Sequence, residues 1–106
     1  MKNNLKPVAT YSNPDLQKDQ IYSENRQAGI YRWTNKINGK IYIGSSQNIS
    51  KRFSQYSNPN YLKRNTSMPI CRALLKHGYE NFDFSIIEYC EVQDLMDREE
   101  YYLNIL

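Results

Sequence analysis

A glutamate near the end of this 106-residue sequence lies where an acidic side chain needs a reason. With each helical residue turned by about 100°, Glu99 falls inside an apolar stripe of segment 92–106, whose other members are Leu95, Met96, Tyr102, Leu103 and Leu106. A carboxylate removed from water needs a cation beside it, because burial without a partner costs several kcal/mol. Arg52 and a divalent metal are the candidates. A purely structural Arg–Glu pair, or a shifted register that exposes Glu99, remains the alternative.

Basic residues gather in one stretch of the chain and acidic residues in the next. Residues 25–79 contain ten Lys or Arg and no acid, whereas residues 80–106 contain eight acids and a single base, Arg98. The basic stretch also holds five tyrosines and the one tryptophan. Lys and Arg neutralise phosphates and flat rings pack on sugars and bases, so this pattern favours a nucleic-acid partner. Two solvated faces that attract each other across the fold are the alternative.

Length and composition exclude several classes of protein. A chain of 12.6 kDa and net charge +3 has the size of one domain. Cys71, Cys90 and a lone histidine are too few for a structural zinc site. We expect no membrane span and no signal peptide, because no apolar run is long enough for a span and the N-terminus lacks an apolar core.

Hydrophobic periodicity predicts the elements that must position these residues. We expect a polar, partly extended or disordered arm over 1–27, with one helical turn near 15–21, and a compact domain from residue 28. Strands are predicted over 28–34, 40–45 and 82–89, with a hairpin turn at Asn38-Gly39. Helices are predicted over 48–56, 69–77 and 92–106, and a loop over 57–68. The order β-β-α-α-β-α predicts a small α/β (α+β) domain with a three-stranded antiparallel sheet flanked by helices.

Two tripeptides on the predicted hairpin add a specific signal. Gly29-Ile30-Tyr31 is followed after ten residues by Tyr42-Ile43-Gly44, and Arg52 and Glu99 come on later helices. In this pattern residues 28–103 resemble the GIY-YIG endonuclease family. The longer segments 29–46, 58–65 and 73–82 are similar to those of nuclease domains encoded in group I introns of fungal mitochondria.

The resemblance implies hydrolysis of phosphodiester bonds in DNA by a metal-dependent endonuclease. It implies one divalent metal on Glu99, with Mg²⁺ expected first and Mn²⁺ as the alternative. A carboxylate is a suitable ligand for such a hard cation. Arg52 would clamp the phosphate with its planar fork. Tyr31 would orient or deprotonate the attacking water, with its pKa lowered by Arg52 and the metal. Tyr42 would hydrogen-bond the phosphate or support Tyr31. Tyr56 would either polarise water or serve as a packing aromatic.

The same resemblance implies a partner and a place of action. Double-stranded DNA is the expected partner, contacted by basic side chains at Arg32, Lys40, Lys51, Lys63 and Arg64. We expect a monomer in solution that can pair with a second copy on DNA, and no membrane partner. A mitochondrial location follows if the protein is intron-encoded, and another intracellular location otherwise.

Two departures from the family pattern leave alternatives open. Asn65 stands where some relatives carry a histidine, and the chain ends at Leu106, so we expect a domain shortened at its C-terminus. One alternative is a catalytically silent nucleic-acid-binding domain with the same fold. Another is a structural role, in which Arg52 and Glu99 form a buried ion pair.

Overall fold

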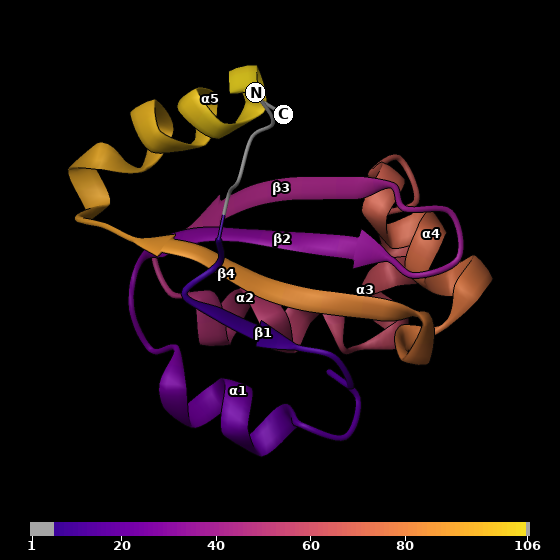
Figure 1. The fold of residues 1–106 in the computed structure, drawn as a ribbon. Helices are drawn as coiled ribbons and strands as arrows, with labels where there is room; N and C mark the ends of the chain where they lie inside the picture. Colours follow the sequence, from indigo (N-terminus) through magenta and orange to yellow (C-terminus); the bar gives the residue numbers. More distant parts are fainter. Residues whose placement is uncertain (1–5, 106) are drawn as a thin grey trace.

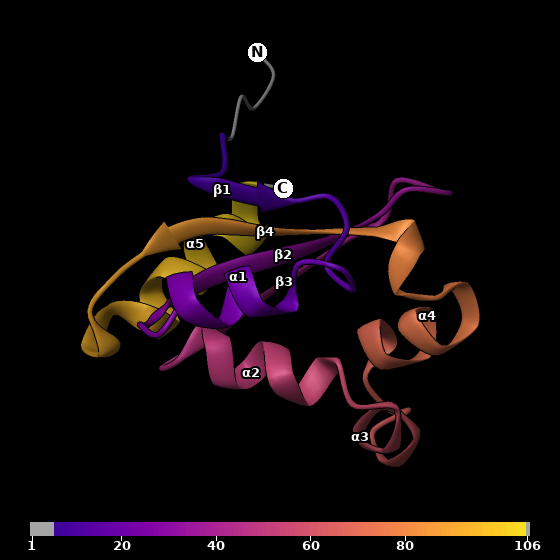
Figure 2. The same cartoon turned by 90° about the horizontal axis from the view of Figure 1, so that it is seen from below.

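The computed structural model describes residues 6–105. It contains four strands and five α-helices (Figures 1 and 2): β1 (Ala9–Tyr11), α1 (Lys18–Glu24), β2 (Gly29–Asn35), β3 (Ile41–Ser46), α2 (Ile49–Tyr56), α3 (Pro59–Arg64), α4 (Pro69–His77), β4 (Phe82–Tyr89) and α5 (Leu95–Ile105). The mixed α/β class with an antiparallel sheet flanked by helices is confirmed. Within the described residues, no helix combines the length and the apolar character needed to cross a membrane.

The sheet has four strands, so the prediction of three was wrong. Its order is β1-β4-β2-β3, with every neighbouring pair antiparallel. The additional strand, β1, comes from the N-terminal segment, where Tyr11 is buried and Ala9 pairs with Ile86 of β4. A strand of three residues shows no alternation in its sequence and forms only because β4 offers an open edge. The same segment contains α1, whose Ile21 is buried.

Helices pack on both faces of the sheet. Trp33 of β2 lies against Phe53 of α2 and Phe84 of β4, in an aromatic core on one face. Ile30 points to the opposite face because side chains alternate along a strand, and there it belongs to a second core cluster with Leu95 of α5. Figure 1 shows α5 beside β3, which is an edge strand of the sheet.

The segment expected to be a loop over 57–68 contains the helix α3. Asn58 caps this helix, because its side chain accepts a hydrogen bond from the backbone N–H of Asn60 at 2.9 Å. Pro59 occupies the first helical position, where its missing N–H costs nothing. The Asn-Pro pair therefore starts a helix instead of excluding one.

The last helix presents a narrower buried face than the sequence predicted. It begins at Leu95 after a single 3₁₀ turn over Val92–Asp94. Leu95 and Tyr102 are buried, but Met96 is 84% exposed and Leu103 is 55% exposed. The wide apolar stripe expected for this helix was wrong, because only one side of α5 contacts the sheet.

A buried amide fastens the N-terminal segment to the domain. Asn25 is fully buried; its Nδ2 donates to the Tyr11 hydroxyl and to the Ile21 carbonyl, and its Oδ1 accepts from the Tyr89 hydroxyl at 2.6 Å. We expect Asn25→Ala to lower the free energy of unfolding by about 2–3 kcal/mol, because it leaves buried polar groups unpaired. Urea unfolding measures this change. Asn60→Ala, which removes an exposed amide from α3, should change it by less than about 0.5 kcal/mol.

Candidate active site

A cavity of about 530 Å³ lies where β3, α2 and α5 meet. It brings together all five side chains that the sequence singled out for catalysis, Tyr31, Tyr42, Arg52, Tyr56 and Glu99. Gly44 and Ser45 line it beside them, as do Ile41, Ile43, Met68, Pro69, Ile70 and Leu103. The cavity is therefore built from residues spread over most of the domain.

The register of the β2–β3 hairpin brings the two motif tyrosines to one side of the sheet. Tyr31 pairs with Gly44, and Trp33 pairs with Tyr42. Residues two apart on a strand share a face, as do directly paired residues, so Tyr31 and Tyr42 lie on the same face. The Tyr31 ring lies over Gly44, where a Cβ atom would come within 2.5 Å of its Cζ and hydroxyl oxygen. Glycine at position 44 leaves the space that this ring fills.

Tyr31, Tyr56 and Arg52 form a compact group inside the cavity. The two hydroxyl oxygens are 2.8 Å apart, and the rings meet edge to face. Burial raises the pKa of both phenols, and the Arg52 charge offsets only part of that effect. The expectation that Arg52 lowers the Tyr31 pKa below its usual value was therefore wrong for the protein alone, because Tyr31 is only 3% exposed. Both phenols are neutral near pH 7.

Glu99 reaches the cavity from α5 and is held by a serine of β3. The Ser45 hydroxyl donates to Glu99 Oε1 at 2.6 Å. The Arg52–Glu99 ion pair that the structural alternative required is absent from the salt bridges of residues 6–105. Glu99 is half-buried, and Arg52 interacts instead with Tyr31 and Tyr56. Sequence reasoning missed Ser45 as a partner of Glu99, although it directly follows the second motif.

A second contact sets the position of α5. Arg98 donates two hydrogen bonds to the Glu88 carboxylate of β4, at 2.7 and 2.8 Å, and the Tyr102 hydroxyl donates to the same group. Hydrogen bonding from Arg98 holds the pKa of Glu88 below its usual value. The pair fixes α5 one residue before Glu99. Its signal in the sequence was Arg98, the only base among eight acids.

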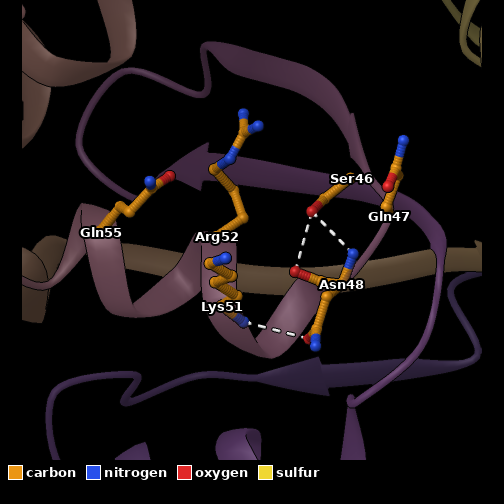
Figure 3. A pocket seen from close by; sticks show the side chains of 6 residues that line it. All are labelled: Ser46, Gln47, Asn48, Lys51, Arg52 and Gln55. Atoms are coloured by element: carbon orange, nitrogen blue, oxygen red, sulfur yellow. Dashed lines mark hydrogen bonds between the residues drawn. The ribbon is translucent and has the colours of Figure 1, made fainter.

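The basic residues predicted to contact DNA are distributed over several surfaces. Lys51 lines a second hollow of about 540 Å³ beside Arg52, with Ser46, Gln47, Asn48 and Gln55 (Figure 3). The Arg52 side chain points away from Asn48 there. Arg52 lines both this hollow and the cavity that contains Tyr31. Lys40 lines a third hollow, between the β2–β3 hairpin and α4.

Three other predicted positions lie outside these hollows. Lys63 and Arg64 are exposed at the end of α3. Arg32 points to the sheet face opposite Tyr31, because it is the next residue along β2. Asn65, expected where some relatives have histidine, donates its amide to the Tyr61 carbonyl at 2.8 Å and does not line the cavity.

Comparisons with known proteins show what this chain is similar to. "Intron-associated endonuclease 1" of Enterobacteria phage T4 is 28% identical over 82 residues, which cover 76% of this chain and 33% of that protein. "Probable intron-encoded endonuclease 1" of Neurospora crassa is 28% identical over an alignment 112 residues long, which covers 94% of this chain and 36% of that protein. The chain thus spans about one third of the length of these relatives.

Solved structures and a family model extend the comparison. The catalytic domain of the homing endonuclease I-TevI has a TM-score of 0.62 and 27% identity, covering 76% of this chain and 88% of that one. A glutamate-to-alanine mutant of the same domain has a TM-score of 0.63 and 27% identity, covering 76% and 84%. The model of the GIY-YIG catalytic domain matches residues 27–105. This chain belongs to the GIY-YIG endonuclease family.

Proposed function

We propose that this domain hydrolyses phosphodiester bonds of double-stranded DNA with the help of one divalent metal. The observation that carries the proposal is the convergence of Tyr31, Tyr42, Arg52, Tyr56 and Glu99 on one cavity. In hydrolysis, the oxygen of a water attacks phosphorus, the bond to the leaving sugar oxygen breaks, and a proton passes to that oxygen. The site must therefore hold the phosphate, orient the water and stabilise the charge that develops.

Arg52 is the phosphate-binding residue in this proposal. We call the cavity that Tyr31 and Glu99 line the catalytic cavity. Arg52 lines both this cavity and the hollow that contains Lys51, and it is half-buried beside Tyr31 and Tyr56. A planar fork of donors suits two phosphate oxygens better than a lysine ammonium does. Tyr42, which faces the same cavity, supplies a further hydroxyl for the phosphate.

Glu99 fits the role of metal ligand. Its Oε1 accepts from Ser45, while its Oε2 makes no hydrogen bond or ion pair with residues 6–105. The described residues contain no group of three or more His, Cys, Asp or Glu side chains around a common point. A site with the single carboxylate of Glu99 suits Mg²⁺, because Mg²⁺ binds through one or two carboxylates together with substrate phosphates and waters. A bound Mg²⁺ would act as a Lewis acid on the phosphoryl oxygens.

Tyr31 orients the attacking water as a neutral phenol. Because burial raises the pKa of Tyr31 and Tyr56, neither hydroxyl ionises between about pH 6 and 9. We expect Tyr31→Phe to lower the cleavage rate while keeping the shape of the wild-type pH–rate profile over this range. Single-turnover rates across the range measure this shape. A break in the wild-type profile that disappears in Tyr31→Phe would show instead that Tyr31 ionises during the reaction.

Plasmid cleavage tests the proposed function. Supercoiled plasmid incubated with the protein and Mg²⁺ should be nicked or linearised, and a chelator should stop the reaction. Arg52→Ala should lose cleavage, whereas Lys51→Ala, which removes the same charge one residue away, should weaken binding and keep most of the rate at saturating protein. Binding without cleavage would identify a silent DNA-binding domain, and no binding at low salt would contradict both readings.

The names of the relatives support proposals about context. We propose that the chain comes from an intron-encoded protein and acts where that intron resides, which is the mitochondrion for a fungal source. We also propose that it is a monomer in solution and that a second copy joins it on DNA to cut the opposite strand. Sedimentation with and without a short duplex measures this change of state.

A further inference from the structure

A third hollow extends from the catalytic cavity along the hairpin. We call it the hairpin groove; its volume is about 410 Å³ and its lining consists of Asn38, Lys40, Tyr42, Pro69, Arg72, Ala73, Lys76 and His77. In Figure 1 the tip of the β2–β3 hairpin lies beside α4, and these two elements form its walls. Tyr42 and Pro69 line both the groove and the catalytic cavity, so the two hollows adjoin.

The hairpin groove is basic on both walls. Lys40 comes from the hairpin, and Arg72, Lys76 and His77 come from α4, while no acid lines the groove. Arg72 donates to the Thr66 carbonyl at 2.6 Å. Lys40 and Lys76 are exposed, and within residues 6–105 their ammonium groups make no hydrogen bond or ion pair. By contrast, Lys36 pairs with Asp83 at 3.8 Å.

The spacing of these charges on α4 has a small cost. Arg72 and Lys76 are four residues apart on one helix, so they are neighbours on its surface. Like charges at this spacing repel each other and destabilise the helix slightly. An external anion between α4 and Lys40 would remove that repulsion. The groove therefore has the chemistry of a phosphate-binding site.

We propose that the hairpin groove binds phosphates next to the scissile one on the DNA strand being cut. The proposal rests on the proposed function for the identity of the anion. DNA carries a phosphate every 3.4 Å of axial rise on each strand, so a strand whose scissile phosphate lies at Arg52 continues over the adjoining surface. On the side of the cavity where Tyr42 lies, the adjoining surface is the hairpin groove, because Tyr42 lines both hollows. The groove thus positions the duplex without touching the reacting atoms.

The salt dependence of DNA binding tests the groove. Affinity for a short labelled duplex is measured by fluorescence anisotropy in chelator, where no cleavage occurs. Each lost phosphate contact should lower the slope of log affinity against log salt by about one. Raising the salt from about 50 to 200 mM weakens DNA binding by a certain factor in wild type. This factor should be about 3.5 times smaller in Lys40→Ala and in Lys76→Ala, and about 12 times smaller in the double variant.

Lys18→Ala is the matched control, because it removes the same charge from α1 at a position outside all three hollows. Its slope should equal that of wild type. An equal fall in Lys18→Ala would show a general charge effect and overturn the proposal, as would unchanged slopes in Lys40→Ala and Lys76→Ala. Circular dichroism checks that the variants, both at exposed positions, are folded.

Neutral methylphosphonate linkages locate the contact on the strand. The neutral linkages are placed one at a time beside the cleavage position. A linkage that faces the groove should weaken binding by wild type. It should have little further effect in Lys76→Ala, since the linkage and the substitution remove the same contact. Additive losses at every position would overturn the assignment. A protein that cleaves but keeps its slopes in the variants contradicts the groove alone, whereas lowered slopes without any cleavage contradict the proposed function alone.

Discussion

Glu99→Gln is expected to reduce the rate of DNA cleavage by about 10³-fold while the fold and the affinity for DNA in chelator stay close to wild type. The amide has the shape of the carboxylate and can still accept the hydrogen bond from Ser45. It lacks the charge that holds a hard cation, so the loss should fall on the chemical step and on the apparent affinity for Mg²⁺. Single-turnover plasmid cleavage over a range of Mg²⁺ concentrations measures both quantities.

Glu100→Gln provides the control for this prediction. Glu100 is the next residue on α5, is exposed and loses the same charge. It does not line the catalytic cavity, so its cleavage rate should remain within about twofold of wild type. A similar fall in both variants, or cleavage by Glu99→Gln within about tenfold of wild type, would contradict the role assigned to Glu99.

Local signals in the sequence predicted most of the elements on which the site stands. Asn48 caps α2 through a hydrogen bond from the Lys51 backbone N–H. Pro69 begins α4, and Gly78 ends it with a φ of 84°. These positions are decided by neighbours in the sequence. The strand β1 depends on pairing with β4, more than seventy residues away in the chain, and no local signal announces it.

The candidate site shows the same division. The resemblance to the GIY-YIG family implied that Tyr31, Tyr42, Arg52 and Glu99 share one site, and all four line one cavity. The rise in the pKa of Tyr31 could not be predicted, because it depends on how fully α2 and β4 cover the ring. The position of Glu99 next to Ser45 likewise depends on the angle at which α5 meets β3. Quantities set by packing between distant segments escape a sequence pattern.

Gly44→Ala is expected to lower cleavage by about 10²-fold, although position 44 has no polar side chain of its own. An added Cβ would meet the Tyr31 Cζ and hydroxyl oxygen at 2.5 Å, closer than atoms approach without one of them moving. The Tyr31 ring is buried and bound to Tyr56, so it must shift and carry its hydroxyl away from the water it orients. A displacement of about 1 Å in a catalytic group can cost about 10²-fold.

Gly39→Ala separates this steric effect from backbone strain. Gly39 has a φ of 77°, and a Cβ there would meet nothing within 4 Å, so this variant is strained at the hairpin tip and leaves Tyr31 in place. We expect urea unfolding to show a loss of about 1 kcal/mol for Gly39→Ala and about 1–3 kcal/mol for Gly44→Ala. Only Gly44→Ala should lose cleavage at saturating DNA. If Gly44→Ala cuts at the wild-type rate, the placement of the Tyr31 hydroxyl does not limit the reaction, and the role given to Tyr31 is wrong.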